Sequence, residues 1–346
     1  MAGPWGYAQA IVVARAIKSR LLKGEEIREM ALSKDLSEAL LVLRESLYRG
    51  VGEARSLTHV FSSVWGSYFR IVRHMAKVAP GEALDAVLAM EREEDLRDLL
   101  IIIQRIASNR PVEEMLPSSF YDGTLTYQVL RDPELLTSPH KVAEALHTTW
   151  AAPYLESSLS ILREVKEGLP IVWAIPLITT RLCSNAIENL RGAKKSGLER
   201  LLCPHLEAKI LSSLVMAKEL GVQTRILEIA WGNIRVCKVS LKSVREIYER
   251  EAEIVGLAEE LKGILRNVKF EGKTLKDITT TSQRNSRLIM RARALEAMSG
   301  YPYNPAFLVA SLVLLKLEVN NVLLTLSSKE FKLKPDEILE ELTLEA

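Results

Sequence analysis

Glu144 and His147 are the residues whose types and spacing come nearest to those of a known reactive site. They form an E-x-x-H pair, the spacing with which di-iron carboxylate bundles place two metal ligands on one helix face. Such a site also needs a second E-x-x-H pair and two more carboxylates, and the chain has no second copy of the pair. We therefore interpret Glu144 and His147 as surface or interface residues.

Cysteine and histidine offer a second possible metal site. Cys203 and His205 flank Pro204 and could give zinc two ligands, but a four-coordinate structural site needs more, and Cys183 is twenty residues away. The three cysteines, with Cys237 as the third, are widely spaced and odd in number. We therefore expect no metal, no disulfide framework and a reducing compartment.

Motifs of nucleotide binding and hydrolysis are missing from the chain. It contains no G-x-x-x-x-G-K-[ST], G-x-G-x-x-G, H-E-x-x-H or G-x-S-x-G, and its five histidines show no pattern of acid–base partners. An active site built from residues distant in sequence stays open as an alternative. The expectation is a protein without catalytic residues or cofactors.

The charge balance argues against nucleic-acid binding. Lys and Arg number 46 and Asp and Glu 44, a formal net charge of +2, whereas nucleic-acid binding needs clustered positive charge. One helix face is nevertheless basic, with Arg284, Arg287 and Arg291 at helical spacing and Arg293 nearby. This face is either simply solvated or a contact surface for an acidic protein partner.

A polar frame occurs at three places along the chain. It consists of two residues three positions apart, which are neighbours along one edge of a helix. Asp95/Asp98 and Glu318/Asn321 are complete copies, whereas only Asn233 remains of the frame between Ala230 and Ile234. We interpret the copies as a degenerate triplication of one helical domain at unequal intervals. Their predicted role is structural, as side chains that bond the backbone ends of neighbouring helices.

The last of these frames lies on a strongly apolar helix. Leu308, Leu312, Leu315, Val319, Val322 and Leu326 recur at spacings of four and three, which only an α-helix places on one face. Its longest apolar run, from Ala306 to Leu315, is too short and its continuation too polar to span a bilayer. The N-terminus has no charged n-region or cleavage site, so no signal peptide is expected either.

Composition and periodicity predict an all-α protein. Apolar residues make up 48% of the chain and aromatic residues 6%, and no segment alternates as a strand would. An exposed turn is expected at 192–197, and the Asn233 frame lies inside the helix expected over 223–251. The expected helices cover 7–23, 25–32, 35–48, 56–78, 82–108, 140–150, 155–166, 171–190, 198–220, 223–251, 281–299 and 305–328. A chain of 346 residues exceeds the usual size of one core. We predict three helical domains, at 1–115, 116–250 and 251–346.

Several of these features resemble one family. Lys316, Glu318, Asn321 and Val322, continued by Pro335, Glu337 and Ile338, look like the K-x-E-h-x-N-h helix (h, apolar) and closing helix of the C subunit of archaeal and bacterial A/V-type ATP synthases. This C subunit is the relative of the d subunit of the vacuolar ATPase. The segment from Tyr7 through Arg15 to Leu22 and the Asp95/Asp98 helix are similar to its first domain, and Leu116-Pro117 to the start of its second. The middle third of the chain matches least.

The resemblance implies a fold and a mechanical function. In that family the protein is a funnel of three similar helical-bundle domains in pseudo-threefold arrangement. It is a non-catalytic part of the central stalk, or rotor, seated on the membrane proteolipid ring and receiving the D and F subunits of the central shaft. The chain is accordingly expected to be cytoplasmic, attached to the inner face of the membrane only through the ring, and a monomer when isolated. An unrelated helical scaffold and a helical enzyme are the alternatives.

Overall fold

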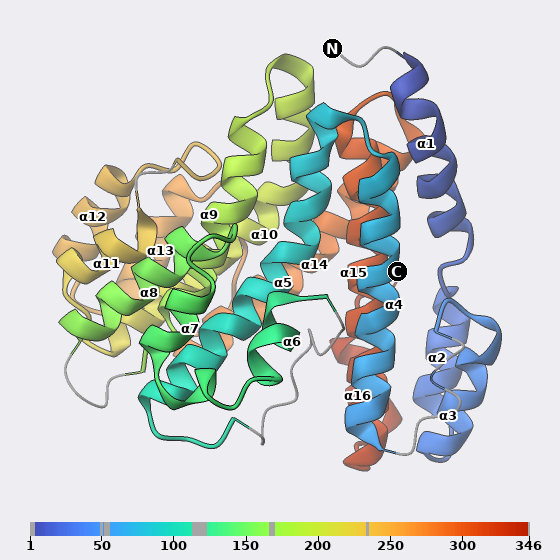
Figure 1. Ribbon diagram of the computed structural model, residues 1–346, viewed down its shortest axis with the longest axis horizontal. Helices are drawn as coiled ribbons and strands as arrows, with labels where there is room; N and C mark the ends of the chain where they lie inside the picture. Colours follow the sequence, from blue (N-terminus) through green and yellow to red (C-terminus); the bar gives the residue numbers. More distant parts are fainter. Residues whose placement is uncertain are drawn as a thin grey trace. The chain divides into compact units, whose positions relative to one another are not determined.

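The computed structural model describes residues 4–48, 51, 56–112, 123–165, 170–232 and 235–344, and these residues form an all-helical structure (Figure 1). No strand occurs among them; two valines, Val236 and Val239, form an isolated antiparallel bridge. The predicted all-α class is confirmed. Backbone contacts group the chain into two compact units, each described separately below. The division into three domains stays a prediction, and Leu116-Pro117, the expected start of the second, lies outside the described residues.

The first unit comprises the described residues of Met1–Glu91 and Met290–Ala346 and is built around one helix, α15 (Pro305–Glu330). Helices α1, α2, α3 and α4 all pack against α15. The unit also holds the beginning of α5 and the end of α14. Its helices are α1 (Pro4–Ser19), α2 (Gly24–Leu32), α3 (Leu36–Val42), the 3₁₀ turn η1 (Leu43–Glu45), α4 (Leu57–Val78), α15 and α16 (Pro335–Glu341).

Helix α15 is buried on almost every side. Asn304 caps its N-terminus by accepting a hydrogen bond from the Ala306 amide, and Pro305 occupies the first turn, where a missing N–H breaks no helical bond. The helix is long and apolar enough to cross a membrane, but 89% of its most apolar window is buried inside the protein. Burial of this kind is what the core helix of a globular unit shows, so α15 is only weak support for a membrane span.

The second unit comprises the described residues of Arg92–Met115 and Asp122–Ile289. Its longest complete helix is α10 (Gly192–Glu219), which packs against α9 and α13 and contains Pro204. The unit includes the rest of α5 (Gly81–Ala107) and of α14 (Leu275–Ser299). Its other helices are α6 (Leu125–Leu130), η3 (Leu135–Thr137), α7 (Pro139–Ala145), α8 (Ala152–Glu164), α9 (Ala174–Glu188), α11 (Thr224–Trp231), α12 (Leu241–Arg250) and α13 (Ile254–Ile264).

Several of the predicted helix limits are wrong, among them that of the helix expected over 140–150, which ends at Ala145. The helix expected over 7–23 ends at Ser19, and Gly24 begins α2, because the Leu22 amide bonds to Glu318 instead of continuing a helix. The turn expected at 192–197 is the first part of α10. Gly192, with φ of +56°, allows the chain to reverse just before it. The helix expected over 35–48 ends as α3 and η1 at Glu45.

The predicted long helix over 223–251 is also wrong. Its place is taken by α11 and α12, separated by Gly232 and the 236–239 turn. Gly232 has φ of +66°, and a Cβ atom added there would lie 3.0 Å from the Arg181 guanidinium. Glycine at this position therefore meets both a backbone and a packing requirement, and it ends α11.

Candidate functional site

Asp95 joins α5 to the start of α6. Its two carboxylate oxygens accept hydrogen bonds from the backbone amides of Leu125 (2.8 Å) and Thr126 (2.9 Å), which are free N–H groups at a helix N-terminus. Asp95 is 3% exposed, and burial raises the pKa of its carboxyl although these hydrogen bonds oppose the rise. Asp98, also buried, instead accepts hydrogen bonds from the Arg97 guanidinium at 3.2–3.3 Å.

Glu318 and Asn321 join α15 to segments that are distant in sequence. Glu318 accepts hydrogen bonds from the Leu22 amide (2.5 Å) and the Tyr48 hydroxyl (2.8 Å), and burial raises the pKa of its carboxyl to about 8. The Asn321 amide makes a reciprocal pair with the Thr343 backbone, accepting from its N–H at 3.0 Å and donating to its carbonyl at 3.2 Å. Both side chains are 5% exposed.

A cavity of about 270 Å³ lies beside this pair in the first unit. Glu318 and Asn321 line it together with three basic residues, Lys18, Lys23 and Arg291, and with leucines of α14, of α15 and of the segment between α1 and α2. Two groups of residues proposed separately from the sequence, the Glu318/Asn321 frame and Arg291 of the basic face, therefore meet at one cavity. The cavity gives solvent access to a carboxyl group that is otherwise enclosed.

The arginines of the basic face differ in their surroundings. All three lie on α14, where Arg284 is exposed and Arg287 and Arg291 are half-buried. Arg287 and Arg291 take part in interactions within the chain. Of the three, Arg284 is thus the side chain best placed to meet another molecule.

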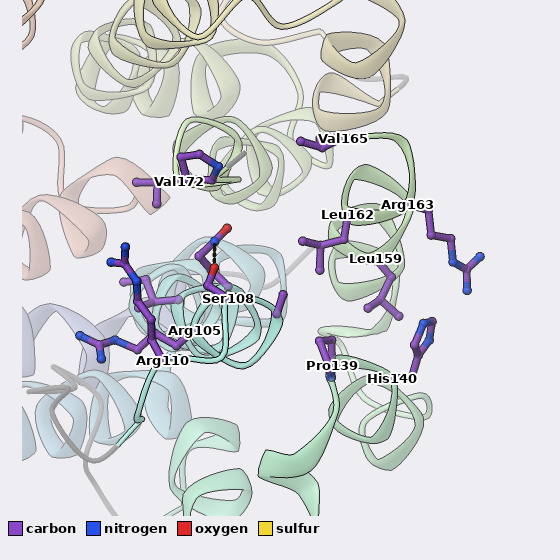
Figure 2. A pocket seen from close by; sticks show the side chains of 14 residues that line it. Arg105, Ser108, Arg110, Pro139, His140, Leu159, Leu162, Arg163, Val165 and Val172 are labelled. Carbon is purple, nitrogen blue, oxygen red and sulfur yellow. Dashed lines mark hydrogen bonds between the residues drawn. The ribbon is translucent and has the colours of Figure 1, made fainter. Parts of the chain in front are cut away.

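The second unit contains a larger groove, of about 700 Å³, between the end of α5 and α8 (Figure 2). Leu159, Leu162 and Val172 are among its apolar lining residues, and Arg105, Arg110, Arg163 and His140 also line it. Arg105 donates to the Pro111 carbonyl at 2.5 Å. None of the described residues that line the groove is acidic.

The remaining candidates do not form a catalytic arrangement among the described residues. His147 and Glu144 are exposed, and the His147 ring bonds to the backbone carbonyl of Glu144 rather than to its carboxylate. The ring of His205 lies 3.3 Å from the Glu93 carboxylate, which is also bonded to Lys209 at 2.5 Å. His205 therefore faces an acid and not a cysteine.

Comparison with known protein families gives one match that covers nearly the whole chain. Residues 10–341 match the family described as ATP synthase (C/AC39) subunit. The chain belongs to this family. It is also similar to the C subunit of the V-type ATP synthase from two strains of Thermus thermophilus, with 26% identity over 211 residues in each. Those alignments cover 61% of this chain, and the chain spans 62% of the length of these relatives.

Glu207 is a residue of this C/AC39 chain that the sequence interpretation missed. On α10 it is 2% exposed, and it accepts hydrogen bonds from the Asn267 backbone amide (2.7 Å) and side-chain amide (3.0 Å). Asp95, Glu207 and Glu318 thus share one arrangement, a buried acid on a long helix that binds a backbone N–H. Their numbers differ by 207 − 95 = 112 and 318 − 207 = 111.

These nearly equal intervals are the signal that could have found Glu207. An apolar residue precedes Glu207 and Glu318, and buried apolar residues follow all three acids at the first and fourth positions: Leu96 and Leu99, Ala208 and Leu211, and Val319 and Val322. The predicted middle copy was placed at Asn233 instead. Asn233 lies outside the described residues, and α11 ends two residues before it. Glu207 lies on a helix at the interval that Asp95 and Glu318 define, and the assignment of Asn233 to the middle copy stays a prediction.

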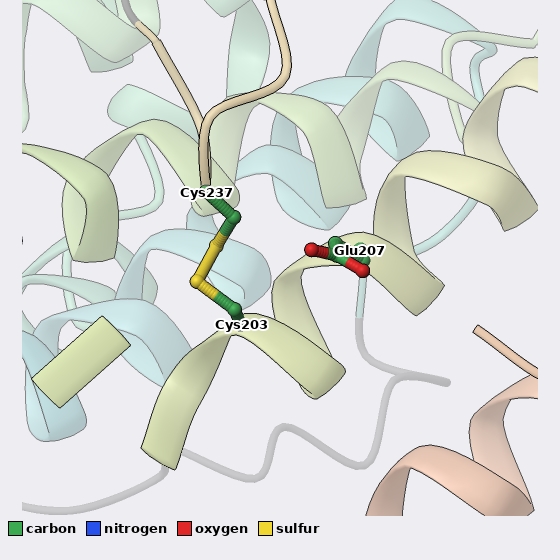
Figure 3. A group of neighbouring side chains, drawn as sticks. All are labelled: Cys203, Glu207 and Cys237. Carbon is green, nitrogen blue, oxygen red and sulfur yellow. A yellow bond between two sulfur atoms is a disulfide. The ribbon is translucent and has the colours of Figure 1, made fainter. Parts of the chain in front are cut away.

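The expectation that the chain carries no disulfide is wrong. Cys203 on α10 and Cys237 in the 236–239 turn are joined by one, with their Cα atoms 5.6 Å apart (Figure 3). Cys183 is buried and is not part of a disulfide. An odd cysteine count and wide spacing led to the wrong expectation because the break between α11 and α12, which brings Cys237 back to α10, was not foreseen.

Proposed function

We propose that this chain is a non-catalytic rotor subunit of an A/V-type ATP synthase. It links the membrane proteolipid ring to the shaft formed by the D and F subunits and transmits rotation between them. The chain has no active site of its own in this proposal, and it is held at the inner face of the membrane through the ring. The observation that carries the proposal is the family match over residues 10–341.

The physical character of the structure supports a mechanical role. A part that transmits torque must resist deformation, and close-packed interiors have low compressibility. The core helix α15 is buried along its length, and Asp95, Glu207 and Glu318 each fasten a long helix to a segment 30 or more residues away in sequence. These hydrogen bonds hold each unit together without adding a reactive group.

The three acids also support the predicted pseudo-threefold plan. Intervals of 112 and 111 residues are what three repeats of one domain would produce. We therefore propose Asp95, Glu207 and Glu318 as the framework acids of three related domains, with Asp98 and Asn321 as secondary contacts. Arg284, Arg287 and Arg291 are proposed as a basic contact for an acidic partner.

Isolation from native cells tests the function. At low salt, the chain is expected to copurify with shaft and ring subunits, and native mass spectrometry should show them in one assembly. The recombinant chain alone should be a monomer and should form a stable complex when purified D and F subunits are added. An assembly of different composition, together with failure to bind D and F, contradicts the rotor proposal.

A further inference from the structure

Cys203, Glu207 and Cys237 form a cluster whose two cysteines have no part in the proposed rotor function (Figure 3). Cys203 and Glu207 are four residues apart on α10, so both project from one face of the helix. Cys237 comes from the turn after α11. The two sulfur atoms and a carboxylate oxygen all lie within 4.8 Å of one another.

The turn that carries Cys237 holds it in a fixed conformation. Cys237 and Lys238 have φ of 49° and 72°, a left-handed conformation that is uncommon for residues other than glycine. Reciprocal backbone hydrogen bonds between Val236 and Val239, of 3.2 and 2.7 Å, close the turn around them. The turn places the sulfur of Cys237 beside Cys203 of α10.

The carboxylate of Glu207 is oriented by its own hydrogen bonds. Asn267 donates to both oxygens, and one carboxylate oxygen lies in the same cluster as the two sulfur atoms. Carboxylates that bind metals are commonly held by such outer donors. The position four residues before the acid is Cys203 for Glu207, but it is Glu91 for Asp95 and Leu314 for Glu318. Of the three acids, only Glu207 therefore has a cysteine at this position.

We propose that reduction of the Cys203–Cys237 disulfide converts this cluster into a Zn²⁺ site, with the two thiolates and the Glu207 carboxylate as ligands. Two thiolates and one carboxylate suit Zn²⁺ rather than Mg²⁺ or Ca²⁺, which prefer oxygen ligands alone. Cys203 is 6% exposed and Cys237 is half-buried, so water can reach the fourth position from the side of the turn. His205 is not available, because its ring faces Glu93.

A dithiol reductant supplies the electrons and protons that this conversion needs. The dithiol gives two electrons and two protons to the Cys203–Cys237 bond and itself becomes a disulfide. Zn²⁺ then replaces the two thiol protons, which pass to solvent. The disulfide and the metal site use the same sulfur atoms, so the two states exclude each other.

Cobalt binding tests the proposal with the full chain. Co²⁺ is added anaerobically to protein that has been reduced with a dithiol and freed of it, and to untreated protein. The reduced protein is expected to bind one equivalent with a thiolate-to-cobalt charge-transfer band, which Zn²⁺ abolishes by displacement. The untreated protein is expected to show no such band.

Single variants separate the ligands from the rest of the protein. C203S and C237S should lose at least half of the charge-transfer intensity and bind Zn²⁺ at least tenfold more weakly. E207Q should keep the band with weaker affinity, and C183S should behave as wild type. Bound Zn²⁺ should also protect Cys203 and Cys237 from alkylation, a readout by mass spectrometry that does not depend on the stability of the variants.

Two outcomes overturn the proposal. One is a reduced wild-type protein that binds no Co²⁺ through thiolates while its two cysteines are alkylated equally fast with and without Zn²⁺. The other is a band that persists unchanged in C237S, which would assign it to a different sulfur. Neither outcome affects the rotor proposal, which uses the hydrogen bonds between Glu207 and Asn267 but neither the two sulfur atoms nor a metal.

Discussion

Glu318 makes the stability of the first unit depend on pH. Its pKa is about 8 in the folded protein against an ordinary value of 4.5. Between these values the folded state keeps a proton that the unfolded state releases. The free energy of unfolding therefore falls as pH rises from about 5 to about 8, by up to ~1.4 kcal/mol per pH unit. Below 4.5 and above 8 this contribution is constant.

The variant E318Q isolates this effect because glutamine does not ionise. Relative to wild type, E318Q should gain stability as pH rises from about 5 to about 8, as measured by urea unfolding at several pH values. Glu25→Gln, in the exposed first turn of α2, is the matched control and should leave the pH profile unchanged. Parallel profiles for E318Q and wild type would contradict the raised pKa.

Asp95 supplies a second test at the level of one residue. In Asp95→Asn, one oxygen acceptor becomes an NH₂ donor opposite the buried amides of Leu125 and Thr126. One N–H then loses its partner, and the free energy of unfolding should fall by about 1–3 kcal/mol. The control is Asp132→Asn, at an exposed acid that accepts from the Glu134 amide. Equal effects of the two variants in urea unfolding would exclude a framework role for Asp95.

At the level of elements, the disulfide fixes the turn after α11 to α10. The two cysteines are 34 residues apart, and closing a loop of this length stabilises a protein by about 2–4 kcal/mol. Reduction in metal-free buffer should therefore lower the melting temperature of wild type and of C183S alike. A C203S/C237S double variant should melt at the reduced value with or without reductant. A wild-type melting temperature that reduction leaves unchanged would show that the bond contributes no stability.

Elements with a local signal were predicted well from the sequence. The apolar stripe of α15, the helix predicted over 56–78 (α4) and the proline that opens α16 each depend on residues within a few positions of one another, so periodicity and local rules for helix ends find them. Such signals explain why the all-α class and several helix limits were correct.

Elements fixed by distant partners could not be found in this way. The Leu22 amide leaves the helical pattern for Glu318, which is 296 residues away, and Asn267 meets Glu207 across 60 residues. Gly232 ends α11 where Arg181 occupies the space of a side chain. No rule about neighbouring residues contains these partners. The interval between the framework acids was the one long-range signal present in the sequence.

At the scale of the whole molecule, the rotor proposal assigns stiffness to the framework acids but leaves the choice of partner to other residues. Their carboxylates are buried and bonded, so a partner must recognise other groups. Among the arginines of α14, Arg284 is exposed, whereas Arg287 and Arg291 are half-buried. An acidic partner would thus be attracted mainly by Arg284 and by the arginines that line the groove of the second unit, Arg105, Arg110 and Arg163.

Charge reversal at Arg284 tests this surface. Arg284→Glu should weaken binding to the purified D and F subunits by about 1–1.5 kcal/mol, roughly a tenfold rise in Kd, because a rim cation is replaced by an anion that repels the acidic partner. The loss should shrink at high salt, where the Debye length is short. Arg191→Glu, at an exposed arginine before α10, is the control and should bind as wild type. Equal binding of D and F by wild type and Arg284→Glu at low salt would show that α14 is not the contact surface. The rotor proposal would stand, because it requires that D and F bind but does not require that they bind to this face.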